Sequence, residues 1–320
     1  MGLLCQRITS QPLSSKKRLT GLWVQRQKLF AIITLLLLTL ISSCSSTSRM
    51  AGPLTAFSSA TGEAAVATKA GIETLQNVDL EKSAHDASKK TELSERLFSP
   101  FLSIGDVHQR LLVLDALSMY ATKMKQLAGI DKTEEIKKNF DDLGASLDSI
   151  SKSIQNVPGV EHKLPDGVFE ALAKIGQELV NLHVANIRDK AISAGLKKTD
   201  PLITQTCALI ASEFSGPHGI FYDQLQTSYR TLQSSINETF KSSKDYQARS
   251  KASNDYGLLL KKKELGLALF DSIANSYLKI GKAHNAILLQ AKENIKSDDA
   301  LNNLTAQIEY TKFIYSQLVK

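Results

Sequence analysis

The chain has 320 residues, of which 39 are Lys or Arg and 32 are Asp or Glu, so its formal net charge is +7. Six of the basic residues and none of the acidic ones lie in residues 1–43. Residues 44–320 therefore hold 33 basic and 32 acidic residues, a net charge of +1. This balance excludes a nucleic-acid-binding function based on net charge, and we expect no nucleic-acid partner.

An apolar segment near the N-terminus predicts export. Basic residues precede an apolar run from Leu29 to Ile41, and small polar residues separate this run from Cys44. That order is typical of an export signal. The run is shorter than the roughly 20 apolar residues that span a bilayer. We therefore expect residues 1–43 to be a signal peptide that is cleaved.

The end of this segment, Ile41-Ser42-Ser43-Cys44, resembles the lipobox of bacterial lipoproteins. The resemblance covers residues 1–44 only. It implies that the thiol of Cys44 carries a diacylglyceryl group, that Cys44 becomes the new N-terminus, and that the protein is lipid-anchored in the bacterial cell envelope. Ser45, in place of an Asp after the cysteine, implies the outer membrane if the host has one, with the protein facing the periplasm or the cell surface.

Two other readings of the N-terminal segment remain open. An uncleaved membrane anchor would need a longer apolar run, and an ordinary secreted protein would more often end its signal in an Ala-x-Ala site. Lipidation is also consistent with the cysteine count. Cys5 leaves with the signal and Cys44 is acylated, so Cys207 has no partner for a disulfide and is expected to be a small buried side chain among apolar neighbours.

Beyond Cys44 the chain reads as helix almost throughout. Residues 44–56 contain Ser, Thr, Gly and Pro, and we expect them to form the lipidated cysteine and its tether, followed by a helical domain over 57–320. A first helix is expected over 57–97, ended by the Ser-Pro pair that follows it. A second is expected over 102–127, before Gly129.

The third expected helix has the clearest heptad pattern. Asp131 and Glu134 form a capping-box pattern at its start. Behind them, apolar residues alternate at spacings of four and three, as in coiled coils. These residues are Ile136, Phe140, Leu143, Leu147, Ile150 and Ile154.

Gly and Pro residues divide the rest of the chain. A fourth helix is expected from Pro165 to about Gly195, and a short fifth over 200–214, opened by Asp200-Pro201. A further heptad pattern covers 222–236, and the polar stretch after it predicts a turn near 250–254. The next helix should run to about Ile295.

Ser297 and two aspartates should cap a last helix. No strand-like alternation bounded by turns occurs. The sequence thus predicts an all-α fold: an elongated antiparallel bundle of about seven or eight helices with coiled-coil-like heptad seams.

The search for catalytic and metal-binding patterns is negative. The six histidines lie at 85, 108, 162, 183, 218 and 284, so no two are three or four residues apart on a helix, where they could share a metal. HExxH, GxSxG, CxxC and phosphate-binding Gly-rich patterns are missing. We expect no catalytic residue, metal ligand or cofactor. His218, in the break after the fifth helix, is expected to be a turn residue.

One basic segment has two interpretations. Lys261-Lys262-Lys263 follow Leu258-Leu259-Leu260, an order that fits a membrane-surface element. The favoured interpretation is a helix with a solvated basic face, because the apolar pattern of an ordinary core continues at Leu265 and Leu269.

These patterns favour a lipid-anchored envelope protein with a helical binding or scaffolding role. Its expected partners are the membrane, through acyl chains on Cys44, and a protein of the envelope. A first alternative is a membrane-active protein resembling α-helical pore-forming proteins, with 202–214 or 258–270 as the inserting segment. A second is an enzyme whose site is assembled from residues distant in the sequence.

Overall fold

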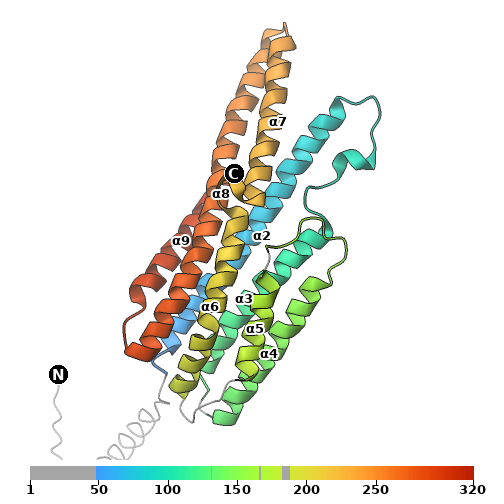
Figure 1. The fold of residues 1–320 in the computed structure, drawn as a ribbon. Coiled ribbons are helices and arrows are strands. Elements are labelled where there is room, and N and C mark those ends of the chain that lie inside the picture. Colours follow the sequence, from blue (N-terminus) through green and yellow to red (C-terminus); the bar gives the residue numbers. More distant parts are fainter. Residues whose placement is uncertain (1–47, 131, 166, 182–187) are drawn as a thin grey trace, which may run out of the picture. The chain divides into compact units, whose positions relative to one another are not determined.

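The computed structural model describes residues 48–130, 132–165, 167–181 and 188–320, so the predicted signal peptide and Cys44 lie outside the described residues. Within these ranges the chain forms eight α-helices and two short 3-10 helices, without a strand, which confirms the all-α prediction (Figure 1). The helices are α2 (Ala51–Ser88), α3 (Ile104–Leu127), α4 (Thr133–Gln155), α5 (Val168–Val180), α6 (Arg188–Phe214), α7 (Ile220–Ser242), α8 (Tyr246–Glu293) and α9 (Asp298–Leu318). The 3-10 helices are η1 (Glu95–Phe98) and η2 (Gly216–His218).

Two long helices, α2 and α8, organise the packing. Helix α8 has 48 residues and packs against α2, α6, α7 and α9, while α2 also packs against α3, α7 and α9. The hydroxyl of Thr68 lies 3.1 Å from that of Tyr277, whereas Arg49 reaches Ala291. Helices α2 and α8 therefore run antiparallel, and most of the core lies between them and their neighbours.

Helix α9 lies beside both of these helices. Its Thr311 hydroxyl is 2.7 Å from that of Ser272, and Lys279 donates to Gln307, so α9 is antiparallel to α8. It must then run parallel to α2, to which Lys312 connects it by an ion pair with Glu63. Leu301, Leu304 and Ile308 of its heptad pattern are buried, as predicted, while Tyr315 and Leu318 are half-buried.

The heptad seam of α4 is internal. Phe140, Leu143, Leu147 and Ile154 are fully buried, Ile136 is nearly so, and Ile150 is half-buried. Helix α4 packs against α3 and α5. It approaches α5 so closely that a Cβ atom on Gly176 would lie 2.6 Å from the carbonyl oxygen of Gly144. Any larger residue at this crossing would force the two backbones apart.

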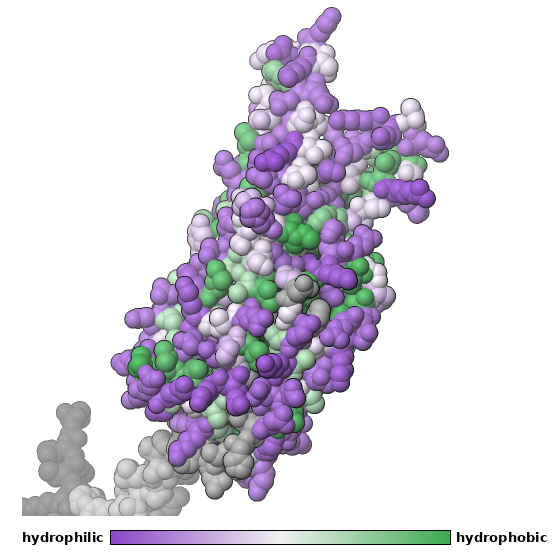
Figure 2. All heavy atoms as spheres, in the orientation of Figure 1, coloured by the Kyte–Doolittle hydropathy of each residue, from purple (hydrophilic) through white to green (hydrophobic). Residues whose placement is uncertain are grey.

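Hydrophilic residues cover most of the face shown in Figure 2, and hydrophobic residues gather there only in small groups. The apolar residues of the predicted seams thus turn mainly inward. No helix in the described ranges is both long enough and apolar enough to span a bilayer.

The first helix begins and ends earlier than predicted. It starts at Ala51, and the side chains of Met50 and Leu54 are fully buried. Residues 51–56, expected in the tether, therefore belong to the bundle. The helix ends at Ser88, where its buried positions cease, and the exposed segment up to Ser99 holds only η1.

The prediction for residues 188–214 is wrong in two ways. Gly195 does not end a helix, and Pro201 does not begin one, because both lie inside the continuous helix α6. Gly195 has a packing role: a Cβ atom there would lie 3.0 Å from the ring of Phe140. Buried residues on both sides of Pro201, including Leu196 and Ile203, hold the helix together across it. Tertiary packing outweighs the local preference of proline here.

The turn predicted near 250–254 lies instead at 243–245. The carboxylate of Asp245 accepts hydrogen bonds from the amides of Gln247 and Ala248, which caps α8. The polar residues 250–254 are helical and mostly exposed, and they lie near the tip of the α7–α8 hairpin. Their polarity indicated solvent contact rather than a turn. At the start of α4 the predicted capping box cannot be followed, since Asp131 lies outside the described residues; Lys132 precedes the helix.

Candidate partner-binding groove

A groove opens where α9 ends and its neighbours continue. Helix α9 stops at Leu318, while α2, α7 and α8 extend further in the same direction (Figure 1). The groove has a volume of about 670 Å³. Its lining comes from α2 (Glu81, His85), α7 (Leu232, Ser235, Ile236), α8 (Asp255, Leu258, Leu259, Lys261, Lys262, Leu265) and the C-terminal end of the chain (Gln317, Leu318, Lys320).

The groove continues the path of α9. Thr311 of α9 lies level with Ser272 of α8, and Leu318 reaches the groove together with Leu265. From Leu265 the groove follows α8 back to Asp255. At 1.5 Å per residue this stretch is about 15 Å long, or almost three helical turns.

The floor of the groove is apolar. Leu232 and Leu259 are buried, and Ile236, Leu265 and Leu318 are half-buried. Leu258 is 62% exposed although it lies in the middle of the groove. An occupant of the groove would remove this side chain from water, and full burial of a leucine typically contributes about 1.5–3 kcal/mol.

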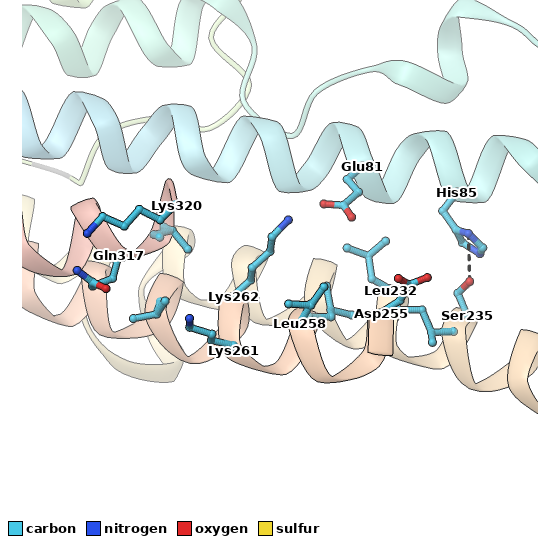
Figure 3. A pocket seen from close by; sticks show the side chains of 14 residues that line it. Glu81, His85, Leu232, Ser235, Asp255, Leu258, Lys261, Lys262, Gln317 and Lys320 are labelled. Atoms are coloured by element: carbon cyan, nitrogen blue, oxygen red, sulfur yellow. Dashed lines mark hydrogen bonds between the residues drawn. The ribbon is translucent and has the colours of Figure 1, made fainter. Parts of the chain in front are cut away.

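Charged side chains border this floor, and the cations are in excess. The lining contains three lysines, Lys261, Lys262 and Lys320, and two acidic residues, Glu81 and Asp255. Asp255 already pairs with Lys251 at 2.6 Å. Figure 3 shows Glu81 and Lys262 extending toward one another from opposite sides of the groove. No ion pair within the described chain involves Glu81 or any of these three lysines, so the groove has a positive lining.

His85 marks the end of the groove distant from α9. Its Nδ1 lies 3.0 Å from the hydroxyl oxygen of Ser235, as the dashed line in Figure 3 indicates. Its Nε2 is buried and has no hydrogen-bond partner in the described part of the chain. A buried polar atom without a partner costs about 1–3 kcal/mol, so a group that bonded this nitrogen would stabilise the structure.

In the segment 258–263, for which the sequence allows two interpretations, the three leucines differ in exposure. Leu259 points into the core, whereas Leu258 and Leu260 are exposed at 62% and 38%. The three leucines therefore do not form one apolar face. Lys261 and Lys262 are exposed and line the groove, as a solvated basic face would, and the segment lies inside α8.

The other singled-out residues are dispersed. Cys207 is buried as predicted, and burial raises the pKa of its thiol to about 12. His218 is exposed in η2, near Lys163 and Ser212, and borders a shallow hollow of about 180 Å³. Cys44 lies outside the described residues. Residues 202–214 form the second half of α6, which packs against α8, and residues 258–270 are an interior stretch of α8.

A largely buried polar network that the sequence does not indicate joins α3, α6 and α8. The hydroxyl of Tyr120 lies 2.7 Å from Nε2 of His284, and Nδ1 of His284 lies 2.8 Å from a carboxylate oxygen of Asp200. Thr199 and Asn285 complete it, at 2.6 Å from Tyr120 and 2.9 Å from Asp200. No local signal could reveal it, since its members are 84 and 164 residues apart in sequence.

The electrostatics of this network suit a structural role. Burial raises the pKa of Tyr120. Burial acts in the same direction on Asp200, but the hydrogen bonds from His284 and Asn285 outweigh it and lower the pKa of Asp200. His284 is fully buried, its ring packs edge-on against Phe57, and no member of the network lines the groove.

A second buried pair joins α3 and α6. Arg110 and Glu213 form an ion pair, and both side chains are almost fully buried. Burial raises the pKa of Glu213, although the charge of Arg110 acts against this shift. Arg110 also donates to the carbonyl oxygens of Asp106 and His162, and the second of these bonds ties the segment around His162 to the bundle.

Across the described residues, no three His, Cys, Asp or Glu side chains form a group that could hold a metal ion. In comparisons with known proteins, no family model, curated protein or solved structure matches this chain.

Proposed function

We propose that this chain is a lipid-anchored protein of the bacterial cell envelope that binds a partner protein in the groove beyond α9. The observation that carries the proposal is the groove itself, in which an exposed leucine, an apolar floor and three unpaired lysines lie along an unfilled continuation of a helix path. The anchor is the acylated Cys44 that the lipobox resemblance implies.

The position of the groove along α8 supports this combination. Arg49, five residues after Cys44, contacts Ala291 near the C-terminal end of α8. The groove begins at Leu265, 26 residues back along the same helix, which corresponds to about 40 Å. Acylation of Cys44 would hold the Arg49 end near the membrane and leave the groove accessible at a distance from it.

In vivo photocrosslinking tests the proposal. A photoreactive amino acid would replace Leu258 in the full chain, and a matched position would be Val66, which is 68% exposed on α2 but does not line the groove. We expect a crosslinked protein adduct from position 258 only, reduced in the Cys44→Ala variant. If position 258 gives no adduct that position 66 lacks, the proposal is wrong.

A further inference from the structure

We infer that the groove receives an amphipathic, acidic α-helix of a partner protein, laid end to end with α9 between α2 and α8. The inference deepens the proposed function, because it names the chemistry of the partner. It depends on three features of the groove: its position in continuation of α9, its apolar floor and its unpaired lysines.

Helix α9 shows what kind of element fits between these walls. It lies against α2 and α8, and its buried residues follow one another at spacings of three and four: Leu301, Leu304, Ile308, Thr311 and Ile314. Beyond Leu318 the same two helices continue, and α7 contributes Leu232 and Ile236 to the floor. The length of about 15 Å admits almost three turns of helix in the same position.

The floor defines the apolar face of the occupant. Leu232, Leu258 and Leu265 are spread along the groove. Leu232 is buried, Leu265 is half-buried and Leu258 is exposed. A helix covers such a floor with apolar residues at i, i+3 or i+4, and i+7, the arrangement by which amphipathic helices bind in grooves.

The border defines the charge of the occupant. Lys261 and Lys262 lie along the α8 side and Lys320 at the α9 end, and none of them forms an ion pair in the described chain. Glu81 is the one acidic lining residue that is similarly unpaired there, because Asp255 pairs with Lys251. Glu or Asp residues beside the apolar stripe of the partner would complement this excess.

Two synthetic helical peptides test this chemistry. One carries leucines at i, i+3, i+4 and i+7 with glutamates beside them, and the other has the same sequence with lysines in place of the glutamates. Binding of each fluorescent peptide to the full chain in detergent is measured by anisotropy. We expect the glutamate peptide to bind at least tenfold more tightly, and its affinity to fall as the salt concentration rises.

Substitutions then locate the binding. Lys262→Glu should reduce or reverse the preference, and Leu258→Asp should abolish binding of the glutamate peptide. The matched controls on the same helix are Lys282→Glu and Leu278→Asp, which change exposed residues away from the groove. Both controls should leave the preference unchanged. Circular dichroism checks the folding of each variant, and the salt dependence of the unmodified chain gives an answer that needs no variant.

The outcomes separate this inference from the proposed function. Equal affinity for the two peptides, binding of neither, or a preference that Lys262→Glu leaves intact would overturn the acidic helix. If photocrosslinking at position 258 nevertheless captures a partner, the proposed function survives with a partner of other chemistry. A crosslinked adduct of two copies of this chain would assign the groove to self-association and also overturn the inference.

Discussion

Arg49 donates a hydrogen bond to the backbone carbonyl oxygen of Ala291 at a distance of 2.7 Å. This contact joins the first described residues of the chain to the last turns of α8. The N-terminus of α8, Tyr246, lies 45 residues earlier, which corresponds to about 70 Å along the helix. One end of α8 therefore lies beside the segment that follows the predicted anchor, and the other end forms the tip of the α7–α8 hairpin.

The first prediction concerns the anchor. Cells that express the full chain should incorporate labelled palmitate into it, and Cys44→Ala should abolish the label and accumulate uncleaved precursor, because the lipobox resemblance implies acylation and cleavage at Cys44. Cys207→Ala is the matched control and should keep the label. Undiminished labelling of the Cys44→Ala variant would contradict the lipobox assignment.

The second prediction concerns the seam of α4. Leu147 is fully buried, and truncation of a buried leucine to alanine typically costs 2–5 kcal/mol. Leu147→Ala should therefore lower the melting temperature by several degrees without any partner present. Leu80→Ala, on a side chain that is 55% exposed on α2, should change it little. Equal melting temperatures for the Leu147→Ala variant and the unmodified protein would show that the seam is not part of the core.

The third prediction concerns the remaining thiol. Cys207 is buried between α6 and α8, where a Cβ atom added to Gly281 would lie 3.8 Å from the Cβ atom of Cys207. Burial disfavours the thiolate and raises the pKa of Cys207 to about 12. The thiolate is the reactive form. Cys207 should react with a maleimide at pH 8 only after unfolding, in protein that carries both Cys5→Ala and Cys44→Ala, because the uncleaved precursor keeps Cys5. Rapid labelling of folded protein would show that this part of α6 opens in solution.

Periodic patterns predicted the core because each seam lies within one helix. The residues from Ile136 to Ile154 are neighbours on one face of α4, so their spacing alone indicates burial. Helix ends were less predictable. Gly195 and Pro201 carry local stop signals, yet contacts with residues far away in the sequence, such as Phe140, maintain the helix.

The groove could not be predicted, because it depends on a difference in length between helices. It exists because α9 ends at Leu318 while α2, α7 and α8 continue, and the spatial relation of these ends follows from tertiary packing. The sequence does display Lys261 and Lys262 beside Leu258. Glu81 and Lys320 line the same groove although they are far from these lysines in the sequence, and no local pattern indicates this proximity.

The last prediction concerns stability in acid and rests on Asp106. Its buried carboxylate accepts hydrogen bonds from the backbone amides of Ser103, Glu161 and His162, at 2.9, 2.9 and 2.6 Å. Burial alone would raise the pKa of Asp106, but these hydrogen bonds outweigh it and lower the pKa below its ordinary value of 3.8. The folded state therefore binds this proton less tightly than the unfolded state does. The resulting stabilisation is complete above pH 3.8 and is lost as the pH falls through the lowered pKa.

Asp106→Asn removes this titration and leaves the neutral amide with one acceptor oxygen where the carboxylate had two. We expect the variant to unfold at lower urea concentration at pH 7, with a cost of about 1–3 kcal/mol. The difference in unfolding free energy between the variant and the unmodified protein should shrink when both are measured near pH 3, because there the unmodified protein loses the contribution of the charged carboxylate. Asp271→Asn, on an exposed side chain of α8, serves as the control and should change the unfolding free energy little at either pH. A difference for Asp106→Asn that stays constant or grows on acidification would mean that the three backbone amides do not stabilise the charged form of Asp106.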